Sequence, residues 1–137
     1  MSRQTPGIDG PPRHRTVSDV MTRRVHVADP LASFTQLVRL IAENRVSAIP
    51  IVDWSGIPIG IVSESDLLLD KTTLSHPQDS VASKIMTSPV ITVAAGASRS
   101  QAASLMRERN VRRLVVVDEG GRIAGIVSRS DLLGLLS

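Results

Sequence analysis

Hydrophobic and polar positions follow one another in the same order in the two halves of the chain. In each half a short apolar stretch precedes a segment whose apolar residues recur with the 3.6-residue period of an amphipathic helix. Two runs rich in β-branched residues come next, joined by a turn that begins with aspartate, as in a β-hairpin. The predicted strands are residues 25–27, 48–52 and 57–62 in the first half and residues 90–93, 114–117 and 122–127 in the second.

Serine marks the start of the predicted long helix in each half. Ser33 and Gln36 have the spacing of a capping box, in which each side chain bonds a backbone N–H that the helix leaves free. The second half repeats this spacing with Ser98 and Gln101. The apolar residues expected to face the core are Phe34, Leu37, Val38 and Ile41 in the first long helix and Ala102, Leu105 and Met106 in the second.

An offset of 65 residues aligns the two halves without a gap, residues 16–70 with residues 81–135. Twenty-one of the fifty-five aligned pairs are identical, where unrelated segments of ordinary composition would share roughly three or four. The agreement includes Gly-Ile-Val-Ser-x-Ser-Asp, which starts at Gly60 and again at Gly125 and leads into a predicted terminal helix. Two copies of one β-α-β-β-α unit therefore account for most of the chain.

We predict an α+β fold of two such repeats packed with pseudo-two-fold symmetry, each with a three-stranded sheet and two helices. Residues 16–70 form the first repeat, residues 71–80 a connector and residues 81–137 the second repeat. Residues 1–15 are rich in proline and arginine without an apolar period, which is typical of a disordered basic arm. Because no signal peptide or membrane-length apolar run is present, we expect a cytoplasmic protein with no membrane partner.

The charge of the chain changes this picture little. A formal net charge of +3 over 137 residues favours, at first sight, a nucleic-acid partner. Residues 1–24 hold the whole excess, and the rest of the chain is neutral. One Trp, one Phe and no Tyr provide no platform for stacking bases. Nucleic acid is therefore not the expected partner, and binding through the arm stays open as an alternative.

Residues able to do covalent or metal chemistry are sparse. The absence of cysteine excludes disulfides, zinc–cysteine sites and thiol nucleophiles. His14, His26 and His76 are too dispersed along the chain for a metal triad, and no nucleophile and base stand in a catalytic arrangement. We expect no catalytic residue, no metal, no cofactor and no enzymatic activity.

The doubled pattern of Val-Met-Thr, an amphipathic helix, an apolar strand ending in Val-Asp, and Gly-Ile-Val-Ser-x-Ser-Asp resembles the cystathionine-β-synthase (CBS) domain pair, or Bateman module. The resemblance covers residues 16–136. It implies two clefts between the repeats that hold an adenosine-containing ligand, namely AMP, ADP or ATP, with S-adenosylmethionine as a further candidate. In the family the aspartate accepts hydrogen bonds from the ribose hydroxyls, and the serine lies near the phosphate.

Carried over residue by residue, the resemblance implies that each cleft mixes both repeats. The first cleft contains Ser63, Asp66, Pro89, Val90, Ile91, Val111, Arg112 and Arg113. The second cleft contains Ser128, Asp131, Arg24, Val25, His26, Val46, Ser47 and Ala48.

The two clefts should be unequal, because the first holds two arginines where the second holds Ser47 and Ala48. Guanidinium groups make strong bonds to phosphate oxygens, so the Asp66 cleft is expected to bind nucleotide more tightly. An alternative from the residues alone is that Ser-x-x-Asp only caps a helix. The protein would then be a ligand-free dimerisation or scaffolding module.

The resemblance also indicates partners. It implies a regulatory, energy-sensing module that forms a homodimer, a flat disc of four repeats with helices at the interface, and that signals to an unidentified effector protein. The leucines of the terminal helices, more numerous than one core face requires, fit burial against a second chain.

Overall fold

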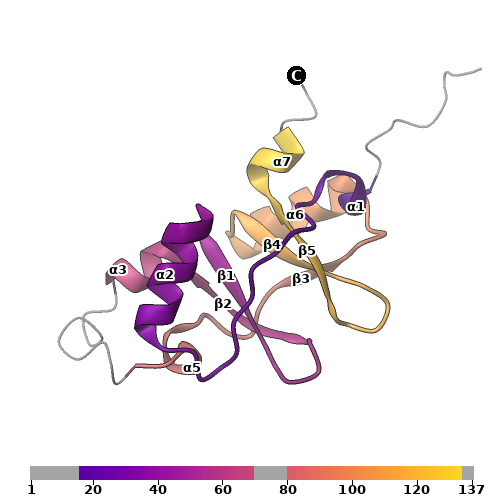
Figure 1. The fold of residues 1–137 in the computed structure, drawn as a ribbon. Helices are drawn as coiled ribbons and strands as arrows, with labels where there is room; N and C mark the ends of the chain where they lie inside the picture. Colours follow the sequence, from indigo (N-terminus) through magenta and orange to yellow (C-terminus); the bar gives the residue numbers. More distant parts are fainter. Residues whose placement is uncertain (1–15, 70–79, 134–137) are drawn as a thin grey trace, which may run out of the picture. The chain divides into compact units, whose positions relative to one another are not determined.

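The computed structural model describes residues 16–69 and 80–133, so the predicted arm and most of the connector lie outside the described residues (Figure 1). A mixed set of short helices and strands confirms the predicted α+β class. In chain order the elements are α1 (Val17–Val20), α2 (Phe34–Asn44), β1 (Ala48–Val52), β2 (Pro58–Ser63), α3 (Glu64–Leu69), α5 (Ala82–Ile85), β3 (Thr92–Ala94), α6 (Arg99–Arg109), β4 (Arg113–Val117), β5 (Ile123–Ser128) and α7 (Arg129–Leu133).

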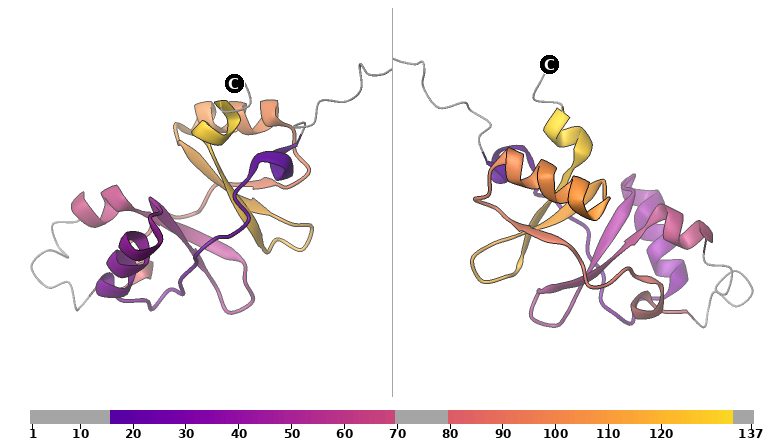
Figure 2. Two further views of the ribbon diagram at one scale, coloured as in Figure 1. Left: turned by 45° about the horizontal axis from the view of Figure 1, so that its top comes forward. Right: turned by 180° about the vertical axis from the view of Figure 1, so that it is seen from behind.

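The described residues form two compact units. Unit A contains the described parts of residues 24–91 together with residues 119–123. Unit B contains residues 16–23 and 92–118 and the described residues from 124 onward. Unit A is built on β1 and β2 with α2 and α3 packed side by side on them, and unit B on β3, β4 and most of β5 with α6 and α7 (Figure 2).

The leading segment of the first repeat belongs to unit B. Val17, the first residue of α1, donates its N–H to the carbonyl oxygen of Ala97 at 2.9 Å. Thr22 and Ile126 exchange two backbone hydrogen bonds, at 2.8 and 3.0 Å, so this segment lines the edge of β5.

The second repeat makes the equivalent contacts in unit A. Ala82, the first residue of α5, donates its N–H to the Ala32 carbonyl at 2.8 Å, and Thr87 exchanges hydrogen bonds of 2.9 and 3.1 Å with Ile61 on β2. The two repeats therefore exchange their leading segments, and the compact units combine residues from both repeats.

Pro50 limits the sheet of unit A to two full strands. In place of the predicted strand over residues 25–27, only Ala28 bridges β1, donating to the Pro50 carbonyl at 3.1 Å and accepting from Val52 at 2.9 Å. The next ladder bond would need an N–H at residue 50, which proline lacks. The equivalent residue in unit B is Val115, and there β3 pairs with β4 in parallel, which completes a three-stranded sheet.

Both predicted capping boxes are confirmed. Ser33 Oγ accepts from the Gln36 N–H at 3.1 Å while the Ser33 N–H donates to Gln36 Oε1 at 2.8 Å, and Ser98 and Gln101 repeat these distances. Val38 was expected to face the core as part of the apolar face of α2, but its side chain is 41% exposed. The core of unit A consists of Ala32, Leu37, Ile41, Ile49, Ile51, Val62, Leu67, Ala82 and Ile85.

Two glycines let the exchanged segments approach the sheets. A Cβ at Gly60 would lie 2.8 Å from Met86 Cγ, and a Cβ at Gly125 would lie 2.7 Å from Met21 Sδ and 2.7 Å from the Thr22 carbonyl oxygen. Contacts this short do not occur between real atoms, so glycine is required wherever the neighbour is rigid. The obstacle at Gly125 is stricter, because a backbone carbonyl moves less easily than a methionine side chain.

Gly125→Ala is therefore expected to lower the free energy of unfolding by about 1–3 kcal/mol, the usual cost of forcing extra atoms into a packed site. The control is Gly96→Ala, since a Cβ at Gly96 meets no atom within 4 Å. Thermal or urea unfolding measures both. Equal stabilities of the two variants would show that the Met21 segment does not pack on Gly125 as described.

Asp53 holds the turn of the first hairpin. Its Oδ1 accepts hydrogen bonds from the Ser55 hydroxyl at 2.7 Å and from the N–H groups of Ser55 and Ile57 at 2.9 and 3.0 Å. These bonds, with that from the Ser55 hydroxyl the largest cause, lower the pKa of the Asp53 carboxyl below its ordinary value of 3.8. The ionised form is therefore favoured by folding.

A depressed folded-state pKa contributes stability above the unfolded-state pKa, and this contribution is lost as pH falls through the folded value. We expect Asp53→Asn to melt below the wild-type protein at pH 7, and the difference in Tm to shrink below about pH 4. Thermal melts at several pH values measure this. A difference in Tm that is constant from pH 7 to pH 2.5 would contradict the assignment of the effect to the charge.

Candidate functional site

Ser63 and Asp66 face each other at the start of α3. The Ser63 N–H donates to Asp66 Oδ2 at 2.8 Å, and the Asp66 N–H donates to Ser63 Oγ at 3.2 Å. These reciprocal bonds form a capping box, so the structural role considered for Ser-x-x-Asp is present. Ser63 Oγ also lies 3.0 Å from Ser65 Oγ.

Ser128 and Asp131 repeat the arrangement at the start of α7, with distances of 2.8 and 3.1 Å. In both boxes only Oδ2 of the aspartate is used, and Oδ1 accepts no hydrogen bond from the described residues. A carboxylate offers about four lone-pair positions on two oxygens. Capping therefore leaves each aspartate able to accept a further hydrogen bond, as from a hydroxyl of a ligand.

The residue just before β1 in unit A, and that just before β4 in unit B, meets the helix start of the same unit. The Glu64 N–H donates to the Ser47 carbonyl at 2.8 Å in unit A, and the Arg129 N–H donates to the Arg112 carbonyl at 2.8 Å in unit B. Within one unit, the fold thus brings Ser47 next to the Ser63–Asp66 box. It brings Arg112 next to the Ser128–Asp131 box in the same way.

This grouping differs from the one expected from the sequence. The expected first cleft combines Asp66 of unit A with Val111, Arg112 and Arg113 of unit B, and it stays a prediction. Its other members, Pro89, Val90 and Ile91, share unit A with Asp66.

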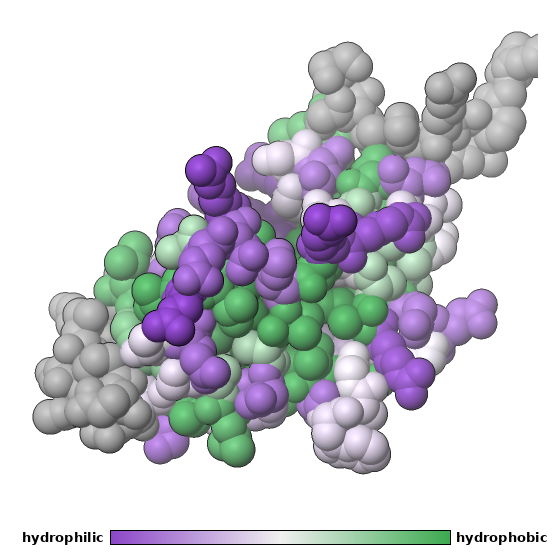
Figure 3. Space-filling view, in the orientation of Figure 1, coloured by the Kyte–Doolittle hydropathy of each residue, from purple (hydrophilic) through white to green (hydrophobic). Residues whose placement is uncertain are grey.

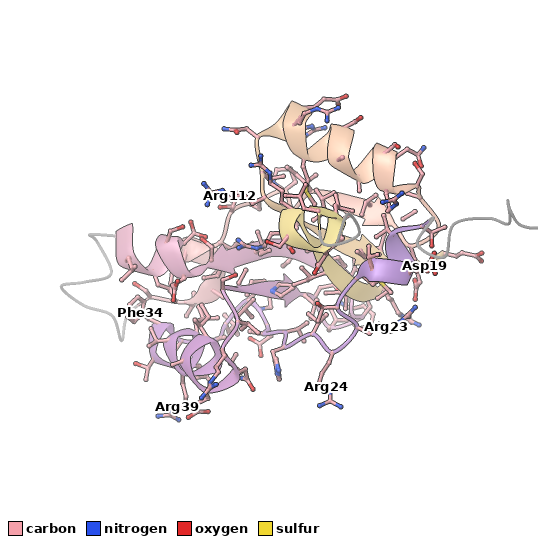
Figure 4. All side chains as sticks on the ribbon, turned by 90° about the horizontal axis from the view of Figure 1, so that it is seen from above. Asp19, Arg23, Arg24, Phe34, Arg39 and Arg112 are labelled. Atoms are coloured by element: carbon pink, nitrogen blue, oxygen red, sulfur yellow. The ribbon has the colours of Figure 1, made fainter. Side chains whose placement is uncertain are left out.

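The expected second cleft likewise joins the two units. Ser128 and Asp131 lie in unit B. The six other residues lie in unit A, and they are Arg24, Val25, His26, Val46, Ser47 and Ala48. Figure 4 shows Arg24 extending away from the ribbon and Arg112 on the connection from α6 to β4.

Sequence reasoning passed over one pair of residues at these helix starts. Residues 60–68 and 125–133 are identical except at one position, which is Glu64 in the first repeat and Arg129 in the second. Both side chains line grooves between helices, together with Ser47 in unit A and Arg112 in unit B. The single difference within nine aligned residues was the signal that could have identified them.

Residues 16–69 and 80–133 contain neither a cluster of metal ligands nor a membrane-spanning helix. No three His, Cys, Asp or Glu side chains in these ranges cluster as metal ligands would. No helix formed by these residues has the length and apolar character needed to cross a bilayer.

Comparison with known proteins agrees with the doubled fold. The family model described as "CBS domain" matches twice, at residues 17–70 and 81–137. The uncharacterized protein MK0525 of Methanopyrus kandleri is 32% identical over 122 residues, which cover 88% of this chain and 62% of the relative. For the uncharacterized protein MJ1232 of Methanocaldococcus jannaschii the identity is 30%, and the chain spans 39% of that relative.

Solved structures give the same result. CBSX2, a CBS-pair protein of Arabidopsis thaliana solved in complex with AMP, has a TM-score of 0.77 at 34% identity, over 88% of this chain and 95% of that one. The CBS domain pair of protein MJ0100, solved in complex with 5′-methylthioadenosine and S-adenosyl-L-methionine, has a TM-score of 0.77 at 26% identity, over 88% and 94% of the two chains.

These matches define a tandem-repeat module of mixed α+β class. The chain belongs to the CBS domain family, as a CBS domain pair. The family and fold class expected from the residues are thereby confirmed.

The capping role of the second box can be tested directly. Ser128→Ala removes the oxygen that accepts from the Asp131 N–H, and we expect it to lower the free energy of unfolding by about 0.5–2 kcal/mol. Ser130→Ala is the matched control, because Ser130 is exposed and its hydroxyl makes no hydrogen bond with the described residues. Chemical unfolding that gives equal midpoints for both variants would rule out a capping contribution.

Proposed function

We propose that this protein is a regulatory module that binds an adenosine-containing ligand of the AMP, ADP or ATP class through the two Ser-x-x-Asp segments. The observation that carries the proposal is the half-used carboxylate in each segment. Asp66 and Asp131 each have one oxygen held by the cap and a second that accepts nothing from the described residues. Because the cap also fixes the carboxylate in place, the second oxygen is pre-positioned to accept from a vicinal diol such as that of ribose.

The ligands of the structural neighbours support the adenosine class. AMP, 5′-methylthioadenosine and S-adenosyl-L-methionine have the adenosine ribose in common and differ in the group at its 5′ position. A carboxylate directed at the ribose therefore suits all three. S-adenosylmethionine stays a second candidate, and the 5′ group is left to other residues.

Arginines are the residues able to select a phosphate at that position. From the sequence, Arg112 and Arg113 were expected to act with Asp66. The bond between the Arg129 N–H and the Arg112 carbonyl in unit B supports their acting with Asp131 instead. In unit A the equivalent bond is accepted by Ser47, which carries no charge. Whether the two arginines act with Asp66 or with Asp131, one site carries more positive charge than the other.

A regulatory module acts by passing its ligand-bound or ligand-free state to another protein. We propose that the module works in the cytoplasm as a homodimer, a disc of four repeats, and passes its state to an effector. Leu68 and Leu133 support an interface on the terminal helices, since they are 71% and 56% exposed. The matched part covers only 62% and 39% of two longer relatives, so this chain spans less than two thirds of their length.

A ligand-free scaffold is the second candidate, and the capping boxes favour it because they already explain Ser-x-x-Asp. Thermal shift with AMP, ADP, ATP and S-adenosylmethionine separates the two functions. A ligand present at ~100-fold over its Kd should add about 2.7 kcal/mol to the free energy of unfolding. No shift with any member of the panel would leave the scaffold as the better account.

Asparagine substitutions separate capping from ligand binding. Asp66→Asn and Asp131→Asn keep an amide oxygen for the serine N–H, so melting without ligand should change little. Each replaces a charged acceptor with a group that also donates, so AMP affinity at that site should fall about ten- to hundredfold. Isothermal titration measures both sites. Unaltered affinity in both variants would exclude the aspartates as ribose ligands.

The arginine assignment is tested in the Asp131→Asn background, where titration reports the Asp66 site alone. If the arginines act with Asp131, adding Arg112→Ala and Arg113→Ala leaves the remaining affinity for AMP unchanged. If they act with Asp66, the remaining affinity falls. Comparison of AMP with adenosine confirms that any loss concerns the phosphate.

A further inference from the structure

Unit B carries a groove of about 770 Å³ between α6 and α7. Its apolar lining includes Met106, which is buried, and Leu133, which is 56% exposed. Apolar residues reach the surface beside α7 (Figure 3). Covering an exposed leucine with a second apolar surface is favourable, and a methionine adapts easily to a partner that packs over it. The groove is therefore suited to an apolar segment of another molecule.

Three arginines, Arg107, Arg112 and Arg129, also line this groove, and no acidic residue does. None of the three forms an ion pair with a residue in the described parts of the chain, and Arg107 donates only to Ser104 Oγ, at 3.4 Å. Like charges gathered in one groove repel one another in the free protein. A partner that brings carboxylates to the groove would replace this repulsion with attraction.

The equivalent groove of unit A, between α2 and α3, lacks this charge. Ala42, Ser47 and Glu64 stand where unit B has its three arginines. The charges of Arg45 and Glu64 cancel, so the lining of the unit A groove is neutral where that of unit B carries +3. Because the unit A groove forms without these arginines, the helix pair does not need them to pack. Their role therefore lies in binding.

The lining of the unit B groove favours a protein segment over nucleic acid as the anionic partner. Surfaces that bind single strands combine basic side chains with aromatic rings on which the bases stack. The only aromatic residues of the chain, Phe34 and Trp54, lie in unit A. An amphipathic helix with acidic residues beside its apolar face would cover Leu133 and pair with the arginines at the same time.

We propose that the unit B groove docks an acidic amphipathic helix of the effector protein, with apolar side chains of that helix on Leu133 and its carboxylates on Arg107 and Arg129. The inference rests on the proposed function, in which the module signals to an effector, and it assigns the surface and the chemistry of that contact. Every residue of the docking groove belongs to unit B. The neutral groove of unit A does not take this helix.

Binding of labelled peptides to the full chain, followed by fluorescence anisotropy, tests the proposal. The probes are peptides of about 15 residues, long enough to form a helix. They carry leucine or isoleucine at positions i, i+3, i+4 and i+7 and glutamate at the flanking positions, and matched peptides carry lysine in place of glutamate. We expect the glutamate peptides to bind and the lysine peptides not to bind. Failure of every glutamate peptide, or equal binding of the lysine peptides, would overturn the proposal.

Substitutions inside and outside the groove separate docking from general attraction of charge. Arg107→Glu reverses a charge inside the groove and should raise the peptide Kd about tenfold. Leu133→Ala removes an exposed apolar contact and should raise the Kd by a similar factor. Arg109→Glu makes the same charge change on α6 outside the groove and is the matched control. Equal losses of affinity in Arg107→Glu and Arg109→Glu would contradict docking in the groove.

Transfer of the charge to unit A gives a test by gain of binding. Ala42→Arg combined with Glu64→Arg changes two exposed residues and leaves that groove with three arginines and no acidic residue. Native mass spectrometry should then show two glutamate peptides per chain, where the wild-type chain binds one. A ratio that stays at one would show that the arginines do not select the groove, which would overturn the proposal.

The other possible occupants give different results. A second copy of this chain is the occupant if the peptide splits a dimer into monomers in native mass spectrometry. Nucleic acid is the occupant if a labelled oligonucleotide binds more tightly than the peptides and loses affinity in Arg107→Glu. Either result would overturn the proposal, whereas an intact oligomer with peptide bound and weak oligonucleotide binding would support it.

Failure of this inference and failure of the proposed nucleotide function are distinguishable. Loss of AMP binding with retained, Arg107-dependent peptide binding removes the nucleotide function and leaves the docking groove. Stabilisation by AMP in a protein that binds none of the peptides leaves the nucleotide function and removes the docking groove.

Discussion

The backbone bridges at Thr22–Ile126 and Thr87–Ile61 are the contacts on which the two compact units depend. Each bridge secures the leading segment of one repeat to the sheet of the other, and each requires a glycine under a methionine. A side chain on either glycine would push the segment away from the edge of the sheet. Because each segment is shared in this way, neither repeat completes its unit with its own residues. The duplication therefore has a structural consequence, since two equivalent sheet edges accept two equivalent segments.

The Ser-x-x-Asp boxes stabilise the helix starts, and in the proposed function the same side chains also recognise the ligand. The cap uses one carboxylate oxygen and one hydroxyl acceptor, and it fixes the orientation of the aspartate. Recognition of a diol needs an acceptor with a defined direction, so the cap prepares the group that the ligand would meet. For this reason the presence of a capping box does not argue against a ligand site, and only a substitution that keeps the cap can separate the two roles.

Duplicated sequences diverge where the two copies meet different neighbours. Here the nine aligned residues 60–68 and 125–133 differ only at Glu64 and Arg129, which line grooves rather than the core. Core positions such as Val62 and Val127 keep the same residue, because both side chains are fully buried.

Local patterns in the sequence were sufficient for the repeat, the α+β class, the helix starts at Ser33 and Ser98, and the Ser-x-x-Asp pairs, because periodicity and capping depend on neighbours a few residues apart. Two further features needed the tertiary structure. The third strand of unit A is reduced to one bridge because Pro50 lacks a donor that only a laterally paired strand would use. The exchange of leading segments could not be read from residues, because Met21-Thr22 and Met86-Thr87 are the same and either could pair with either sheet. Because the two leading segments have the same residues at the pairing positions, the packing of the whole chain decides which sheet each segment joins.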